Sequence, residues 1–328
     1  MKILLVTVHS STFTRVDFEI LSSRHLVTYL DFSSGRISLL KVFRLIKQND
    51  LIYFWFISLR FITPLLLSKL LRRKVIFVAG GYDVAGLKEL NYGSMSSEWK
   101  SLIIKGMIKI SDRILSVSKS NYNEVITNCK IDPDKLEMIY HGFKSPEFFD
   151  LDDKEDKIVT IGFIDNTSFY RKGIDRFLKL AGYMVHIDFN LIGRIDINLN
   201  NIIIPENVRI HGYLGKEQFI KLLRSAKIYV QLSRHEAFGY SVAEAMQYGC
   251  IPVVSNCYSL PEVVGNTGLI VNDAENYKEI AEGINILLKN YDKTLAIRCI
   301  ERVNNLFSLN KRSEKILDTI DSLNEGKS

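Results

Sequence analysis

Short apolar runs alternate with amphipathic stretches along almost the whole chain. In the first half, the expected strands are runs of Val, Ile, Leu and aromatic residues at 2–8, 26–31, 51–56, 74–79, 113–117 and 136–139. Segments of helical periodicity, such as 99–110 and 119–129, lie between them. Continuous apolar strands that alternate with helices are typical of a parallel sheet buried on both faces. The pattern therefore predicts a doubly wound α/β domain.

Residues 144–157 interrupt this rhythm, because they are acidic, contain Pro146 and lack periodicity. Beyond them, strands are expected at 158–163, 187–192, 208–211, 228–232, 251–255 and 269–271, with helices between and after them. We interpret 144–157 as an interdomain linker. The chain should then form two Rossmann-like α/β domains facing a cleft, over 1–148 and 149–310. A final helix over 311–328 would cross back to the first domain.

Composition narrows the class of protein. Of the 328 residues, 47% are hydrophobic and 24% are charged, which indicates a folded protein with material for two cores. The net charge of +6 is uneven: residues 1–148 hold 21 basic and 13 acidic residues, whereas 149–328 hold 22 and 24. A basic first half favours an anionic partner there, and a merely solubilising surface is the alternative.

Four cysteines, without a C-x-x-C pair or zinc spacing, favour reduced thiols. The apolar run at 3–8 is too short for a secretory signal, so we expect a cytoplasmic protein. The loops that should follow strands lack the G-x-G-x-x-G, G-x-x-x-x-G-K-[ST] and G-x-S-x-G patterns. Their absence argues against a nicotinamide dehydrogenase, a P-loop hydrolase and an α/β-hydrolase. Without an acidic metal motif, no metal or cofactor is expected, and no nucleic-acid partner.

The most informative segment is SRHEAFGYSVAEAMQYGCIPVV, residues 233–254. Glu236 lies in the loop after an expected strand, and Glu244 follows eight positions later inside the next helix. Open N–H groups at a helix start bind anions, and paired carboxylates accept hydrogen bonds from hydroxyls. The relevant amides are those of Phe238, Gly239, Tyr240 and Ser241. The segment suits a ligand with phosphate and several hydroxyls, although two solvated glutamates are the plainer alternative.

Arg171 and Lys172 form the second signal, at a strand-to-helix junction that ends in Gly173. Two cations there can neutralise a diphosphate leaving group. Solvated side chains are again the alternative interpretation.

The segment from Glu236 to Val254 resembles the E-x7-E signature of retaining glycosyltransferases with the GT-B fold, the glycosyl transferases group 1 or family 4-like proteins. The resemblance implies that Glu244 holds the ribose of a nucleotide diphosphate sugar and that Glu236 contacts the transferred sugar near its reacting carbon. The amides of 238–241 would contact sugar hydroxyls and phosphate. Lys172 and Arg171 would hold the diphosphate, Arg171 replacing an arginine whose usual position is occupied by Phe163.

Three further residues are expected contacts by the same resemblance. Gly193 and Tyr213 lie in loops that frame the nucleotide base in the family. Asp83 follows a Gly80-Gly81 pair and is the candidate for a catalytic contact with sugar or acceptor, with Glu236 and Lys172 as the other candidate catalytic residues. A helix-capping role for Asp83 is the alternative.

The resemblance implies a metal-independent, retaining hexosyltransferase that acts on a glycan or lipid-linked acceptor in cell-envelope polysaccharide or lipid-linked glycan synthesis. Front-face attack, with the departing phosphate accepting the acceptor's proton, is the expected mechanism. Two alternatives stay open. A nucleotide-sugar epimerase of GT-B fold would act without an acceptor, and a non-catalytic sugar-nucleotide-binding subunit would bind the donor without transfer.

The helix expected at 99–110 bears on membrane contact. Its apolar residues Trp99, Leu102, Ile103, Met107 and Ile110 share one face, and lysines occupy the remainder. With the basic first half, this pattern is compatible with peripheral attachment to the inner face of an anionic membrane. Packing of the apolar face into the protein core is the alternative.

Overall fold

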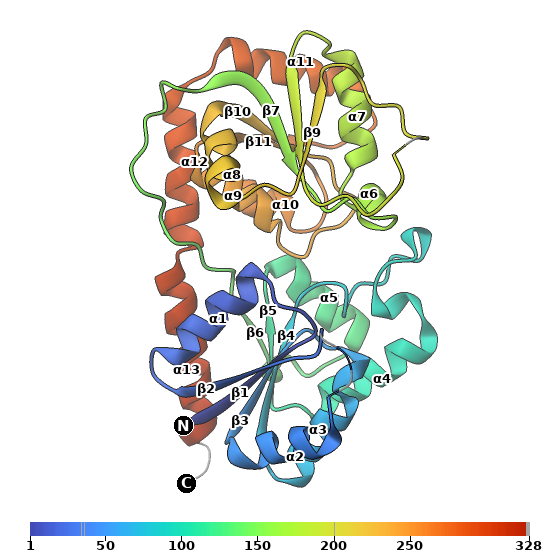
Figure 1. Ribbon diagram of the computed structural model, residues 1–328, viewed down its shortest axis with the longest axis vertical. Coiled ribbons are helices and arrows are strands. Elements are labelled where there is room, and N and C mark those ends of the chain that lie inside the picture. Colours follow the sequence, from blue (N-terminus) through green and yellow to red (C-terminus); the bar gives the residue numbers. More distant parts are fainter. Residues whose placement is uncertain (34, 36, 200, 326–328) are drawn as a thin grey trace. The chain divides into compact units, whose positions relative to one another are not determined.

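The computed structural model describes residues 1–33, 35, 37–199 and 201–325. The chain divides into two compact units: Met1–Gly142 together with Leu309–Ser328 forms unit 1, and Phe143–Ser308 forms unit 2 (Figure 1). The division after residue 142 comes six residues earlier than the expected domain end at 148. The second division, after residue 308, lies two residues before the expected one.

Unit 1 is built on a six-stranded parallel sheet with the order β2-β1-β3-β4-β5-β6. Its strands are β1 (Lys2–Thr7), β2 (Leu26–Asp31), β3 (Leu51–Trp55), β4 (Lys74–Ala79), β5 (Arg113–Ser116) and β6 (Leu136–Met138). Every residue of β3 is buried, as its uninterrupted apolar sequence predicts for a central parallel strand.

The helices of unit 1 are α1 (Thr12–Ser22), α2 (Leu39–Gln48), α3 (Ile62–Leu70), α4 (Glu98–Ile110), α5 (Lys119–Cys129) and α13 (Leu309–Glu325). Serine side chains at Ser11, Ser38 and Ser118 accept hydrogen bonds from amides in the first turns of α1, α2 and α5, which explains why these helices begin where they do. Neighbouring helices α2, α3, α4 and α5 touch in succession.

The apolar face predicted for α4 is partly wrong. Ile104, Met107 and Ile108 are the buried residues of this helix. Trp99 and Leu102, which were expected on the same face as Met107, are exposed. The buried side of α4 thus includes Ile104 and Ile108, which the predicted face did not contain, so the apolar periodicity did not identify the side that packs on the core.

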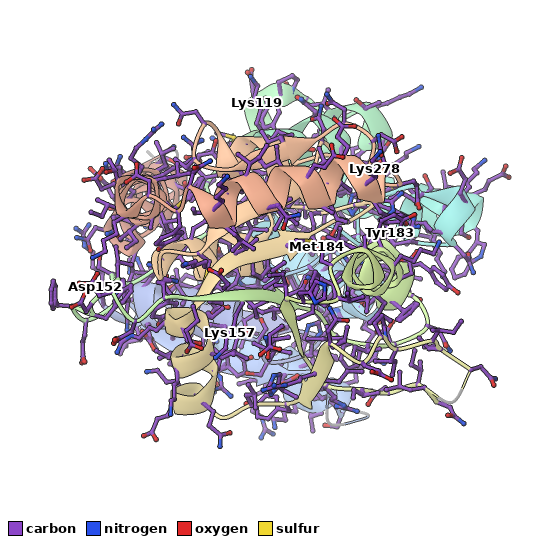
Figure 2. The ribbon with its side chains drawn as sticks, turned by 90° about the horizontal axis from the view of Figure 1, so that it is seen from above. Lys119, Asp152, Lys157, Tyr183, Met184 and Lys278 are labelled. Atoms are coloured by element: carbon purple, nitrogen blue, oxygen red, sulfur yellow. The ribbon has the colours of Figure 1, made fainter. Side chains whose placement is uncertain are left out.

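Unit 2 repeats the design with the order β12-β11-β10-β7-β8-β9, again all parallel. Its strands are β7 (Glu155–Ile161), β8 (Asp188–Ile192), β9 (Val208–Gly212), β10 (Ala226–Gln231), β11 (Ile251–Ser255) and β12 (Leu269–Val271). Its helices are α6 (Ser168–Arg171), α7 (Ile174–Tyr183), α8 (Lys216–Ser225), α9 (Tyr240–Gln247), α10 (Leu260–Val264), α11 (Tyr277–Lys289) and α12 (Lys293–Leu306). Figure 2 shows Lys157 on β7, Tyr183 and Met184 at the end of α7, and Lys278 at the start of α11.

The expected linker is shorter than its composition indicated, because β7 already begins at Glu155. Just before it, Lys154 is buried, and its Nζ donates to the carbonyl oxygens of Leu223 at 3.0 Å and Ala226 at 2.6 Å. Burial lowers the pKa of Lys154. A charged sequence that looks like linker therefore supplies the start of a strand and a structural lysine.

One buried ion pair ties α13 to the rest of unit 1. Arg312 donates from Nε and Nη2 to the two carboxylate oxygens of Asp17 on α1, at 2.6 and 2.8 Å, and from Nη1 to the carbonyl of Tyr140 at 2.7 Å. Tyr53 and Trp55 on β3 also donate to Asp17, at 2.9 and 2.7 Å. The pair is almost fully buried, so each charge has lost its hydration and is compensated by the opposite charge.

Asp17→Asn should lower the free energy of unfolding of unit 1 by about 3–5 kcal/mol, because it leaves the Arg312 guanidinium buried without a counter-charge. The matched control is Asp321→Asn, which removes an exposed ion pair to Arg24 between α13 and the chain just after α1. That change should cost less than about 1 kcal/mol. Thermal and denaturant unfolding of both variants provide the measurement, and equal effects would contradict the role of the buried pair.

Candidate functional site

The strand order of unit 2 selects one place in its sheet for a ligand. From β7 the chain proceeds to β8 and β9 on one side, and it then returns to β10 on the other side of β7. In open parallel sheets, ligands bind beyond the carboxyl ends of the strands where the order reverses in this way. Two loops meet at this point: residues 162–173 after β7, and residues 232–239 after β10.

These two loops are in direct contact. Gly173 has φ +69°, and a Cβ at this position would lie 2.1 Å from the carbonyl oxygen of Leu232. A glycine is required there both by the backbone conformation and by the close approach. The amide of Arg234 donates to the carbonyl of Arg171 at 2.7 Å, and the Arg234 guanidinium makes a two-pronged ion pair with Asp175 on α7, with both N–O distances at 2.8 Å. The loop after β10 is thus fixed to the residues around Lys172.

Glu236, Lys172 and Arg171 come together at this junction. One carboxylate oxygen of Glu236 lies 3.3 Å from Lys172 Nζ and 3.5 Å from Arg171 Nη1. All three side chains are less than a fifth exposed. Burial alone would raise the pKa of Glu236, but the two cations outweigh burial and lower it. Burial lowers the pKa of Lys172, and Glu236 acts against that change.

A buried hydrogen-bond network orients the same carboxylate. Gln231, at the end of β10, donates from Nε2 to Glu236 at 2.8 Å and to Ser233 Oγ at 3.1 Å. Its Oε1 accepts from Tyr229 at 2.7 Å and from Ser241, in the first turn of α9, at 3.0 Å. All four hydrogen-bonding positions of the Gln231 amide are therefore used. Gln231 links the loop that carries Glu236 to the start of the helix that carries Glu244.

Sequence reasoning missed Gln231, Arg234 and Asp175. One signal was available for Gln231: a glutamine that ends an otherwise apolar strand must find buried partners. Nothing in the sequence pairs Arg234 with Asp175, because 59 residues separate them.

The start of α9 is shaped by Gly239, which has φ +86° and precedes the helix. The side chain of Phe238 turns into the core, where its ring packs at 5.2 Å on Phe307. The first amides of a helix lack partners within the helix. With Tyr240 and Ser241 as its first residues, α9 therefore directs its N-terminal dipole toward the same end of the sheet as Glu236.

Glu244 lies inside α9, between the buried residues Ala243 and Ala245. In the described part of the chain it makes neither a hydrogen bond nor an ion pair within the protein, in contrast to Glu236. Burial raises the pKa of Glu244 to about 7. A carboxyl group in this setting is only partly ionised at neutral pH, so a hydroxyl-bearing ligand would supply the partners that the protein does not.

Gly193 and Tyr213 lie in loops at the ends of β8 and β9. A Cβ at Gly193 would lie 1.8 Å from the carbonyl oxygen of Gly162, so this glycine serves the packing of two neighbouring loops. Tyr213 is 85% exposed. Their predicted contacts with a nucleotide base stay predictions.

Asp83 lies in unit 1, in the loop after β4. Its carboxylate accepts three backbone amides: Ile57 at 2.9 Å, Gly80 at 3.1 Å and Gly81 at 2.8 Å. Burial raises the pKa of Asp83 to about 6, and these amides act against the rise. The carboxylate therefore joins the loop after β3 to the loop after β4 rather than capping a helix. Its predicted contact with sugar or acceptor stays a prediction.

Neither a metal-binding cluster nor a membrane-spanning helix occurs among the described residues. They contain no group of three or more His, Cys, Asp or Glu side chains arranged to hold a metal ion. None of their helices has the length and apolar character needed to cross a bilayer.

Comparisons with known proteins agree with this geometry. Residues 146–305 match the family described as Glycosyl transferases group 1. The O-antigen chain mannosyltransferase B of Escherichia coli is 42% identical over 65 residues, which are 20% of this chain and 17% of that protein. The MMP alpha-(1->4)-mannosyltransferase of Mycolicibacterium hassiacum is 23% identical over 190 residues, 52% of this chain and 46% of that protein. The chain spans about half or less of the length of the curated relatives it matches.

Solved structures extend the likeness to both units. HepE of Anabaena, in complex with UDP and glucose, superposes with a TM-score of 0.75 at 16% identity, covering 98% of this chain and 100% of that one. Sucrose-phosphate synthase of Thermosynechococcus elongatus gives a TM-score of 0.76 at 14% identity, covering 99% and 100%. At such identities the likeness establishes the fold, which confirms the predicted α/β class. The chain therefore has the GT-B fold, and its residues 146–305 match the family Glycosyl transferases group 1.

Proposed function

We propose that this protein transfers a sugar from a nucleotide diphosphate sugar to a hydroxyl group of a glycan or lipid-linked acceptor, with retention of the anomeric configuration. The observation that carries the proposal is the cluster of Lys172, Arg171 and Glu236 at the switch point of unit 2. The mannosyltransferases among its relatives, and the UDP and glucose bound by HepE, support the same reaction class.

The cations would act on the leaving group. Lys172 and Arg171 share one carboxylate, which leaves the cluster with one net positive charge. A diphosphate that gains negative charge as the glycosidic bond breaks is stabilised by such fixed cations and by the amides at the start of α9. Side-chain cations thus serve the leaving group in this proposal, without a metal ion.

The two glutamates would have different tasks. Glu236 is kept ionised and oriented by its cations and by Gln231, so it suits a fixed contact to the transferred sugar. Glu244 lacks protein partners and suits the two ribose hydroxyls, which would donate to its carboxylate.

The same restraints shape the proposed mechanism. Both cations and Gln231 hold Glu236 through one carboxylate oxygen, and we assign this charge-paired group a positioning role rather than that of a covalent nucleophile. The acceptor oxygen would instead attack the anomeric carbon from the face of the departing diphosphate. A new carbon–oxygen bond forms, the bond from that carbon to the phosphate oxygen breaks, and this phosphate oxygen takes the proton of the acceptor hydroxyl.

The setting we propose is cell-envelope polysaccharide or lipid-linked glycan synthesis on the cytoplasmic side of a membrane, with peripheral rather than spanning attachment. Support comes from the O-antigen and mannosyltransferase relatives and from the basic charge of the first half of the chain.

The reaction is tested by incubating the full chain with nucleotide diphosphate sugars and glycan or lipid-linked acceptors, and by reading the product anomer by NMR. Lys172→Ala should lower kcat by 100-fold or more, about the effect of removing one fixed transition-state donor. The matched control is Lys221→Ala, which removes an exposed lysine of the same unit and should leave kcat unchanged. Inverted product, donor turnover without acceptor, or full activity in Lys172→Ala would each contradict the proposal.

Gln231→Leu should lower kcat about tenfold or more with a smaller change in KM, because Glu236 loses the hydrogen bond that sets its orientation. Tyr229→Phe is the matched control. It removes a hydroxyl from the far side of the Gln231 amide and leaves the bond to Glu236 intact. Steady-state kinetics of both variants, alongside their melting temperatures, separate orientation from loss of fold. Equal kinetic effects in the two variants would reject this role.

Donor affinity should rise with pH through about 7. Below that pH the partly buried Glu244 is protonated, whereas the ionised carboxylate accepts hydroxyl hydrogen bonds more strongly. The dissociation constant of a nucleotide diphosphate sugar, measured calorimetrically from pH 6 to 8, should fall in the parent protein. Glu244→Gln should abolish this dependence. A pH-dependent Kd that persists in Glu244→Gln would assign the titration to another group.

A further inference from the structure

Helices α2 and α3 of unit 1 carry apolar side chains on their outer sides. Leu39, Leu40 and Phe43 are exposed on α2, and Leu66 and Leu70 on α3, with 56 to 75% of each leucine accessible and 36% of Phe43. Leu39 and Phe43 are four residues apart, as are Leu66 and Leu70, so each pair lies on one side of its helix. The two helices pack against each other. A concentration of exposed leucines on adjacent helices indicates a contact surface.

The charge of the same segment is almost entirely of one sign. From Phe32 to Tyr82, Asp50 is the single acidic residue, against nine basic ones. The basic residues are Arg36, Lys41, Arg44, Lys47, Arg60, Lys69, Arg72, Arg73 and Lys74. Asp50 accepts the Lys2 amide at 2.9 Å, so its carboxylate is engaged at the start of β1.

Cations and leucines are interleaved on the helices. Leu40, Arg44 and Lys47 recur at intervals of four and three, so they follow one another along the outer side of α2, where both cations are exposed. Arg72 is exposed just beyond α3. Arg73 donates to the carbonyl of Lys47 at 2.8 Å and so joins the ends of the two helices. We call this region the α2–α3 surface: Leu39, Leu40, Phe43, Leu66 and Leu70, with Lys41, Arg44, Lys47 and Arg72.

The neighbouring helix extends the pattern. Helix α4 touches α3, and it exposes Trp99, Leu102 and Ile110 on a helix that carries three lysines. Helices α2, α3 and α4 together hold eight of the ten large apolar residues that are exposed in the described part of unit 1.

We propose that the α2–α3 surface docks on an anionic phospholipid bilayer. Leucine and phenylalanine side chains bury in the boundary between headgroups and acyl chains, and the surrounding Lys and Arg side chains meet anionic headgroups. A second copy of this chain is a poorer occupant, because a symmetric contact would bring the same positive charges together. The assignment rests on the peripheral attachment proposed above, for which it names the surface. It is independent of the proposed donor chemistry, because the surface lies in unit 1 and the donor cluster in unit 2.

The test is flotation of the full chain with vesicles of phosphatidylcholine alone and with 30% phosphatidylglycerol. The chain should bind the anionic vesicles and not the neutral ones, and high salt should weaken binding. Arg44→Gln/Lys47→Gln should weaken the partition about 25-fold, at roughly fivefold for each basic residue. Leu40→Ser should also reduce binding. The matched controls lie on α11: Lys278→Gln/Lys289→Gln, with Lys278 labelled in Figure 2, and Ile286→Ser, which is similarly exposed.

Control variants should float like the parent chain, and all variants should keep the parent melting temperature. The assignment would be overturned if the chain showed no preference for anionic vesicles, or if the α2 and α11 variants lost vesicle binding equally. It would also be overturned if the chain formed a dimer in solution that Leu40→Ser dissociates, and did not bind vesicles. Sugar transfer to a soluble acceptor is measured in the same preparations. This activity assay distinguishes a failure of membrane docking from a failure of the proposed reaction. Loss of vesicle binding with full turnover would confirm the surface alone.

Discussion

The ionised carboxylate of Glu236 is the constraint on which the arrangement of unit 2 depends. A buried carboxylate is costly unless cations and hydrogen bonds compensate it. Here the compensation comes from the loop after β7, through Lys172 and Arg171, and from the end of β10, through Gln231. To deliver both, the two loops must touch, which is why Gly173 approaches the carbonyl of Leu232 so closely. The positive cluster that results is a by-product of keeping one negative charge buried.

Local sequence signals predicted the frame of this site well. The alternation of apolar strands and helices led to two parallel sheets, and the positions of Glu236 and Glu244 on a loop and in a helix follow from the strand, the Gly239 turn and the helix around them. These features depend on residues a few positions apart, which a sequence displays directly. Strand ends were harder to place, since Glu155 and Lys157 at the start of β7 look like linker composition.

Contacts between distant residues could not be predicted in the same way. Arg234 meets Asp175 only because β7 and β10 are neighbours in the sheet, and Arg312 meets Asp17 across almost the full length of the sequence. The contacts of Asp83 could not be predicted from the sequence either. A Gly-Gly-x-Asp loop is compatible with ligand contact, yet its carboxylate accepts backbone amides of two loops. For α4, the period of the apolar residues was visible, but not which side of the helix packs on the core.

The Asp17–Arg312 pair also sets an order for assembly during synthesis. The ribosome delivers Asp17, Tyr53 and Trp55 long before Arg312, so the nascent first unit waits with an acidic group that lacks its cation. Unit 2 is interposed in the chain and is complete by residue 308, which leaves it able to reach its native state first. Residues 1–142 thus depend on residues 309–325, which are translated only after the whole of unit 2.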